Sequence, residues 1–240
     1  MRIKGLVSVL CLSMNHEKYV RQGCISIIDQ TYRDIEIVYV DNNSKDETFE
    51  IADELFRKSG LPYKGFKRKE NYGISANVNF LLNHAQGEFI AFLSADDWWA
   101  NDHLEHSLDS FVRHPEYGLV YTNGHLFKQI DQSKFIFYNS PQESGWVFNK
   151  LLQGNFIQAV GVVIRAEVLN VVGGFDENSP IEDWEMWLRI SQNFQVGYVH
   201  QPTVFYRATG SNLTFDLDFM NKGFDYIFNK YSAYPGIKKA

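Results

Sequence analysis

The first hundred residues contain two patterns of apolar and polar positions, one typical of strands and one typical of helices. Short apolar runs with the β-branched content of buried strands lie at 6–13, 34–41 and 87–94, and a weaker strand is expected near 63–68. Between them, apolar side chains recur every three or four residues, as on one face of a helix. Strands that alternate with helices predict an α/β protein whose central, mostly parallel sheet is flanked by helices.

The second half of the chain has a less regular pattern. Strands are expected at 117–127 and 157–165, a short helix at 143–154, and an amphipathic helix at 181–192. No internal repeat, low-complexity tract or Pro-rich linker interrupts the chain. Residues 1–240 are therefore expected to form a single domain, with a tail at 211–240, rich in Phe and Tyr, that packs on the body or on a partner.

Composition and charge narrow the possible partners. Hydrophobic residues make up 45% of the 240 residues and charged residues 22%, as in an ordinary globular protein. The net charge of −6 argues against nucleic acid as a partner, because binding phosphate backbones needs a basic face. One basic cluster is interpreted as solvated surface in preference to a phosphate or membrane patch; it comprises Arg57, Lys58, Lys64, Lys67, Arg68 and Lys69.

The two cysteines and the N-terminal segment indicate a cytoplasmic protein. Cys11 and Cys24 both lie in apolar stretches, which is typical of core residues in a reducing compartment and not of a disulfide framework. The apolar run at the N-terminus is too short to span a bilayer and has no small-residue cleavage site.

Polar side chains follow two of the predicted strands directly. Asn42 and Ser44 come after the second strand, and Asp96 and Asp97 after the fourth. Ligands bind outside the carboxyl ends of strands in such sheets, so both clusters are expected at one edge. Adjacent carboxylates repel unless a cation lies between them, and Mg²⁺ is often held by one or two carboxylates together with substrate phosphates. Ser44 with Glu47 also has the spacing of a capping box.

Other interpretations of these residues stay open. Asp96 and Asp97 also fit an N-cap and a first-turn acid of a helix that starts near residue 101. Trp98 and Trp99 suit core residues or the wall of a site. His103 and His106 are weak evidence for zinc, and surface positions are expected for them.

A third carboxylate of interest lies in the stretch "PIEDWEMWLRI". Asp183 falls in the first turn of the predicted helix, where it either stabilises the helix dipole or acts as a general base in a cleft. Glu185 and Arg189 form an i,i+4 pair that is expected on the outer surface of this helix.

Several common signatures are absent from the sequence. It contains no G-x-G-x-x-G after the first strand, no G-x-x-x-x-G-K-[ST] loop and no G-x-S-x-G elbow. Dinucleotide oxidoreductases, P-loop enzymes and esterases are therefore disfavoured.

In combination, these segments resemble the inverting family-2 glycosyltransferases, which have the GT-A fold, over about residues 6–207. The similar segments are "VSVLCLSMNHEKYVRQGCISIIDQTYRDIEIVYVDNNSKDET", "NYGISANVNF", "FLSADDWW" and "GNFIQAVGVVIRAEVLNVVGGFDENSPIEDWEMWLRI". The resemblance implies a nucleotide-sugar-binding half at about 1–100 and an acceptor-binding half at about 101–210. The order and spacing of the four segments along the chain are more specific to the family than any single segment is.

The resemblance also implies roles for individual residues. The residues expected to bind the nucleoside part of the donor are Ser13, Asn15, Asp41, Asn42 and Asp96. Asp97, together with Asp96, is expected to hold the Mn²⁺ or Mg²⁺ ion that bridges the diphosphate, because such an ion neutralises charge on the leaving group. Asp183 is expected to be the catalytic base, which takes the proton from an acceptor hydroxyl.

Four positions depart from the family pattern. Asn42 stands in place of a frequent second Asp, and its amide is expected to pair with a pyrimidine base. Ser94 replaces the first Asp of the D-x-D region, Val78 replaces a basic residue, and Thr209 replaces a frequent His. These changes put the base preference and the phosphate and metal contacts in question.

The resemblance implies a metal-dependent inverting glycosyltransferase, with a nucleotide-sugar donor and a saccharide or lipid-linked saccharide acceptor. The enzyme is expected to take part in the synthesis of a bacterial surface polysaccharide or glycolipid. Peripheral contact of the protein with the inner face of the membrane is left open. Two rival functions stay open. A catalytically silent sugar- or protein-binding module would not need three site carboxylates. A sugar nucleotidyltransferase should carry a Gly-rich loop, and "SMNHEKY" has none.

Overall fold

The computed structural model describes residues 2–210 and 212–237, and its first half is a parallel β/α sheet. The parallel strands stand in the order β3-β2-β1-β4, and their bounds are Ile3–Ser13 (β1), Ile35–Asp41 (β2), Tyr63–Lys67 (β3) and Gly87–Ser94 (β4). All seven residues of β2 are buried, as expected of a strand covered on both faces. The four expected strands and their parallel arrangement are confirmed.

The second half of the chain extends the same sheet to β3-β2-β1-β4-β8-β6-β9-β5, with β7 on β6. The added strands are β5 (Trp98–Trp99), β6 (Tyr117–Lys128), β7 (Lys134–Ile136), β8 (Val162–Arg165) and β9 (Gln195–Ala208). Because β8 runs antiparallel to both β4 and β6, the sheet is parallel at one end and mixed at the other. The long β9 strand returns to pair parallel with β6.

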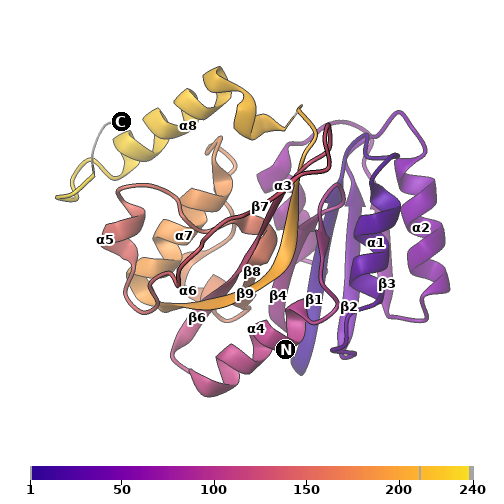
Figure 1. The fold of residues 1–240 in the computed structure, drawn as a ribbon, viewed down its shortest axis with the longest axis horizontal. Helices are drawn as coiled ribbons and strands as arrows, with labels where there is room; N and C mark the ends of the chain where they lie inside the picture. Colours follow the sequence, from indigo (N-terminus) through magenta and orange to yellow (C-terminus); the bar gives the residue numbers. More distant parts are fainter. Residues whose placement is uncertain (1, 211, 238–240) are drawn as a thin grey trace.

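Helices cover the two faces of the sheet with two separate apolar cores. One face carries α1 (Val20–Ile28), α2 (Thr48–Lys58) and α4 (His103–Arg113). The other carries α3 (Ile74–Leu82), α5 (Phe148–Leu151), α6 (Val168–Val172), α7 (Glu182–Asn193) and α8 (Leu217–Lys230). Figure 1 shows α1 and α2 beside the parallel strands at one end of the molecule and α8, in yellow, toward the other.

The cysteines are core residues, as expected. Cys11 on β1 and Cys24 on α1 are both fully buried and free. Burial raises the pKa of each thiol well above its ordinary value, so neither is a reactive thiolate.

The predicted capping box at the start of α2 is wrong. The helix begins at Thr48, after Glu47, and no side chain caps it. Ser44 is bonded instead to Asp41 at the end of β2, through both its backbone N–H and its hydroxyl. The serine therefore closes the strand-to-helix turn rather than the helix end.

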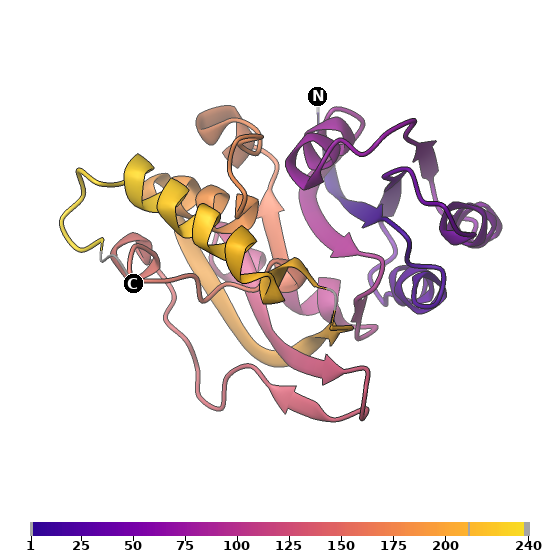
Figure 2. The same cartoon turned by 90° about the horizontal axis from the view of Figure 1, so that it is seen from above.

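The predicted surface position of Glu185 is also wrong. Its side chain is fully buried, and it accepts from the Arg189 guanidinium at 2.9 Å and lies 2.8 Å from Lys230 Nζ of α8. Lys230 Nζ also lies 2.6 Å from Asp176 Oδ2, which accepts a hydrogen bond from Tyr226. A buried carboxylate needs such partners, so these ion pairs stabilise the packing of α8 on α7. Figure 2 shows α8, in yellow, lying along α7.

The C-terminal helix packs on the body through its buried side. Ile227, and Tyr231 just after the helix, are buried in the same core as the apolar residues of α7. Phe215, just before the helix, and Leu217 at its start are exposed. Within residues 2–210 and 212–237, no helix is both long and apolar enough to cross a bilayer.

Candidate functional site

Residues at the carboxyl ends of β1 and β2 form a hydrogen-bonded cluster. Ser13 Oγ donates to Asp41 Oδ2 at 3.1 Å and lies 2.6 Å from Tyr39 Oη. Asp41 has no exposed surface, and its two oxygens accept from Ser13 and Ser44. Ser13 and Asp41, two of the five residues predicted to bind the nucleoside, are therefore hydrogen-bonded within the protein, where they hold the "DNNS" turn.

The Asn42 amide is likewise engaged within the protein. Its Nδ2 donates to Asn71 Oδ1 at 2.8 Å, and its Oδ1 accepts from the Tyr72 backbone N–H at 3.0 Å. The expected pairing of this amide with a pyrimidine would require both bonds to break. In this arrangement Asn42 links the β2 turn to the loop before α3.

Asn15 lies in the loop between β1 and α1, exposed at the same edge. Its φ of 56° is in the left-handed region, which Asn tolerates better than most residues. Its backbone N–H donates to Ser44 Oγ, and its Oδ1 accepts from the Lys45 backbone N–H at 2.9 Å. The two loops that follow β1 and β2 are thus joined side by side.

The Asp96–Asp97 pair lies in the turn after β4, and its two carboxylates differ in exposure. Asp97 is 4% exposed, and its Oδ1 accepts from the Arg207 backbone N–H of β9 at 2.7 Å. Asp96 is partly exposed, and its Oδ1 accepts from Ser94 Oγ at 2.5 Å. Burial and the Asp96 charge raise the pKa of Asp97, so a cation beside the pair would favour its ionised form.

The Arg207 side chain, which is buried, holds this turn in place. Its Nε donates to the Asp96 carbonyl at 2.6 Å, and its two terminal nitrogens donate to Gln22 of α1 and to Gln129. Its guanidinium also lies 4.4 Å from the centroid of the Trp98 ring. Capping of a helix by the two aspartates, the alternative interpretation, is not observed, because α4 begins only at His103.

Gly23 of α1 sets how closely the helix approaches the turn. A Cβ at this position would lie 2.7 Å from the Ala95 carbonyl oxygen and 2.9 Å from that of Asp97. Both oxygens are backbone atoms, so the turn itself would have to move.

We expect Gly23→Ala to disturb the turn more than the fold. Overpacking of this kind costs about 1–3 kcal/mol of stability, and the displaced carboxylates should bind divalent metal more weakly. Thermal unfolding and metal titration measure the two effects. Ile25→Ala, on the exposed face of the same helix, is the control. Full metal affinity in a destabilised Gly23→Ala protein would contradict this role of the glycine.

The aromatic residues after the turn pack against other parts of the protein. Trp99 is 3% exposed and donates from Nε1 to the Val160 carbonyl at 2.8 Å, while Trp98 stacks on Phe205 at 4.8 Å. The predicted surface position of His103 is wrong. It is fully buried against Thr203, and burial lowers its pKa to about 3.

The residues near Asp96 fit a divalent cation. The Nδ1 atom of His16 is buried without a hydrogen-bond partner and lies 3.7 Å from Asp96 Oδ1. No group of three or more His, Cys, Asp or Glu side chains with the geometry of a metal site occurs within the described ranges. An ion here would therefore draw part of its shell from water or from phosphate oxygens, as Mg²⁺ commonly does.

Asp183 lies in the first turn of α7, as expected. Its Oδ2 accepts from Asn155 Nδ2 at 3.2 Å, and its Oδ1 from the Trp184 backbone N–H at 2.6 Å. Burial raises the pKa of Asp183, although both hydrogen bonds oppose the shift. A raised pKa improves a carboxylate as a proton acceptor near neutral pH. No hydrogen bond or ion pair found in the described part of the chain joins Asp183 to the Asp96–Asp97 turn.

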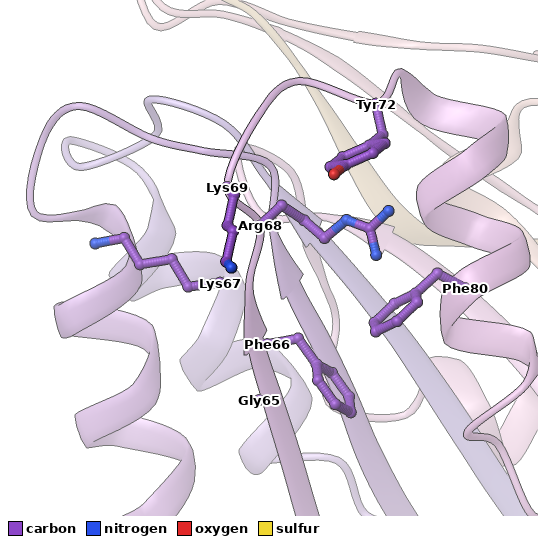
Figure 3. Close-up of a pocket in the computed structure, with 7 residues that line it drawn as sticks. All are labelled: Gly65, Phe66, Lys67, Arg68, Lys69, Tyr72 and Phe80. Carbon is purple, nitrogen blue, oxygen red and sulfur yellow. The ribbon is translucent and has the colours of Figure 1, made fainter.

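The predicted basic cluster divides into separate parts. Arg57 and Lys58 pair with acidic residues on their own helix, and Lys67 pairs with Glu50. Arg68 instead lies between two aromatic rings, 3.9 Å from the centroid of Tyr72 and 4.4 Å from that of Phe80, as Figure 3 shows.

Arg68 lines a cavity of about 380 Å³ beside the carboxyl edge of the sheet. Lys67 and Lys69 also line it, and the Nε of Arg68 is buried without a hydrogen-bond partner. The cavity therefore has positive charge and an unused donor, which suits an anionic ligand. The earlier interpretation of Arg68 as solvated surface is incorrect.

Sequence reasoning missed four residues that shape this edge, namely His16, Gly23, Asn155 and Arg207. Asn155 and Arg207 lie inside the stretch that carries the family resemblance, but only their contacts with Asp183 and Asp97 reveal their positions. A signal for Gly23 was a glycine inside an otherwise helical pattern.

The fold and the edge together define a class of protein. A parallel β/α sheet continued by mixed strands, with polar loops after β1 and β2 and carboxylates after β4, is the architecture of GT-A-type glycosyltransferases. Residues 8–171 match the family described as "Glycosyl transferase family 2", and the chain belongs to this family.

Known proteins of similar sequence and structure agree with this assignment. An "uncharacterized glycosyltransferase" of Haemophilus influenzae is 30% identical over 210 residues, which cover 84% of this chain and 79% of that protein. Chondroitin synthase of Escherichia coli is 27% identical over 98% of this chain, which spans 34% of that protein's length. The chain is thus a glycosyltransferase, and it corresponds to only part of some of its relatives.

Two solved structures show the same fold at low sequence identity. S. aureus TarS 1–349, in complex with UDP-GlcNAc, is 19% identical and has a TM-score of 0.72, over 98% of this chain and 68% of that one. The mannosyltransferase PcManGT from Pyrobaculum calidifontis, in complex with GDP-Man and Mn²⁺, is 21% identical with a TM-score of 0.70, over 97% and 66%.

Proposed function

We propose that this protein is a metal-dependent, inverting glycosyltransferase that moves a sugar from a nucleotide-diphosphate donor to an acceptor hydroxyl. The observation that carries the proposal is the Asp96–Asp97 turn at the carboxyl edge of a GT-A-type sheet, with a third carboxylate of raised pKa on α7. A silent binding module has no chemical need for this combination.

The donor's nucleoside binds across the loops after β1, β2 and β3 in this proposal. The exposed part of the Asn15 loop and the turn at Asn42 form one wall, which Ser13 and Asp41 hold from beneath. Arg68, with its unpartnered Nε and its two aromatic neighbours, forms another. A guanidinium whose two faces lie against aromatic rings still has N–H donors along its edge, and these suit phosphate oxygens.

Asp96 faces the divalent ion in the proposed site, and Asp97 lies behind it against β9. The greater exposure of Asp96 and the backbone bond that Asp97 receives from Arg207 support this division. Bound Mn²⁺ or Mg²⁺ would neutralise negative charge on the leaving nucleoside diphosphate. The structure of PcManGT with GDP-Man and Mn²⁺ supports such an ion in a protein of this fold.

Asp183 is the proposed general base. It accepts the proton of the acceptor hydroxyl as that oxygen attacks the anomeric carbon opposite the leaving group, and the configuration therefore inverts. Asn155 orients the carboxylate by its hydrogen bond to Oδ2. The likeness to chondroitin synthase supports a saccharide acceptor and a place in bacterial envelope polysaccharide synthesis.

Calorimetric titration with UDP, dTDP and GDP, each with Mn²⁺ and then with EDTA, tests the proposal. We expect one diphosphate to bind tightly only when metal is present, which also identifies the donor's nucleotide. If none of the three binds to folded protein, the silent module becomes the better interpretation. If a nucleoside diphosphate binds equally well in Mn²⁺ and in EDTA, the proposed metal dependence is rejected, and the proposed nucleotide-sugar donor is retained.

A further inference from the structure

His16 is held firmly at the edge of the proposed ion site by its own backbone. It lies in the loop between β1 and α1, where its N–H donates to Thr48 Oγ1 of α2 at 2.7 Å. Its carbonyl accepts from the N–H groups of Tyr19 and Val20, each at 2.8 Å, at the start of α1. Three hydrogen bonds to two helices thus fix the residue's backbone.

The imidazole ring places an unused nitrogen beside Asp96. His16 Nδ1 has almost no accessible surface and no hydrogen-bond partner, and a buried polar atom without a partner costs stability. The nearest charged atom is Asp96 Oδ1 at 3.7 Å, which is too far for a hydrogen bond. The side chains are 20% and 14% exposed, so neither is a freely solvated surface group.

Both atoms are within reach of one metal ion. Ligand bonds to such ions are about 2.1 Å long, so two of them span up to about 4.2 Å. Asp96 Oδ1 and His16 Nδ1, at 3.7 Å, fall inside this limit. We infer that His16 is a nitrogen ligand of the divalent ion that Asp96 holds, and that it makes the site prefer Mn²⁺ to Mg²⁺.

The preference follows from the chemistry of the ligand. Imidazole nitrogen is a ligand of first-row transition metals, of which Mn²⁺ binds it most weakly, whereas Mg²⁺ takes carboxylate, water and phosphate oxygens. A site with Asp96 alone would treat the two ions alike apart from their size. Adding His16 selectively strengthens the binding of Mn²⁺. The inference rests on the proposed function for the presence of the ion, but it concerns a residue that the proposed function does not need.

Electron spin-echo spectroscopy of Mn²⁺ added to the protein with UDP or GDP tests ligation directly. A directly bound imidazole nitrogen modulates the echo, so we expect a ¹⁴N modulation in the wild-type protein and its loss in His16→Leu. The control is His106→Asn, because His106 Nε2 also lies near a carboxylate, 3.3 Å from Asp102 Oδ2, on the surface of α4. That variant should keep the modulation.

Calorimetry with Mn²⁺ and Mg²⁺ measures the preference. We expect His16→Leu to weaken Mn²⁺-dependent nucleotide binding by about 10- to 100-fold, with a much smaller loss for Mg²⁺. His16→Asn, which preserves polarity and removes the ring nitrogens, should behave in the same way if it folds better. Equal losses for the two ions, or a ¹⁴N modulation that survives in both variants, would overturn the inference.

The outcome also separates this inference from the proposed function. If the wild-type protein binds nucleotide in a metal-dependent way but without ¹⁴N modulation, the function stands and the role of His16 is rejected. If the wild-type protein binds no nucleotide with any metal, the proposed function itself fails.

Discussion

Asp183→Asn is expected to leave nucleotide binding nearly unchanged while turnover falls by a factor on the order of a hundred or more, as for loss of a general base. The amide keeps the size of the side chain, and its one oxygen can still accept from the Trp184 N–H. Its NH2 group cannot accept from Asn155 Nδ2, so that weaker contact is lost. The amide cannot take a proton from the acceptor. Release of nucleoside diphosphate from the donor measures turnover, and calorimetry measures binding.

A neighbouring carboxylate provides a matched control for this experiment. Glu182 lies in the same turn of α7 and is likewise partly buried. Glu182→Gln should retain most of the turnover. Equal losses of binding and turnover in Asp183→Asn would instead make Asp183 part of the scaffold.

The pH profile follows from the environment of the same residue. Burial raises the pKa of Asp183 above its ordinary value of 3.8, and only the deprotonated form acts as a base. Turnover should therefore fall as the pH is lowered, with its acid limb at a higher pH than an ordinary aspartate gives. In Asp183→Asn the residual turnover should lack this limb.

Asp96→Asn is expected to weaken nucleoside-diphosphate binding by about 10- to 100-fold in the presence of Mn²⁺ and to change nothing in EDTA. The physical reason is that a neutral amide oxygen is a much poorer ligand for a divalent cation than a carboxylate. The amide can still bond to Ser94, so the turn should keep its shape. Calorimetry at several metal concentrations measures the change.

Two further variants sharpen the result. Asp102→Asn, on an exposed carboxylate just before α4, should bind nucleotide like the wild-type protein. Asp97→Asn preserves an oxygen that can accept from the Arg207 N–H and removes only the charge. A loss in Asp97→Asn that equals the loss in Asp96→Asn would assign both carboxylates to the ion, and an unchanged metal dependence in Asp96→Asn would reject its role.

The parallel half of the fold was predictable because its pattern is local. Each strand there is a short apolar run, and each helix has an apolar face, so β1 to β4 follow from the sequence. The order of the added strands did not follow, because β6 pairs with β9 across some 80 residues. No local pattern encodes which of two distant strands will be neighbours.

The positions of the site residues were predictable, but their contacts were not. Asp41, Asn42 and Asp97 lie at strand ends or just after them, where ligands bind, yet each forms hydrogen bonds with the protein itself. Strand ends are also where loops must be fixed to one another, and the same polar residue types serve both purposes. Glu185 was misplaced because its partner Lys230 comes from a helix 45 residues further along.

The hydrogen bond from the Arg207 N–H to Asp97 determines when the turn after β4 can become fixed during translation. The two residues are separated by 110 positions, so a ribosome that adds about 5–20 residues per second needs roughly 5 to 20 s to pass from one to the other. During that interval the nascent chain carries the acidic turn without the strand that holds it. The ion site of the proposed function would therefore be complete only late in translation, once β9 has been made.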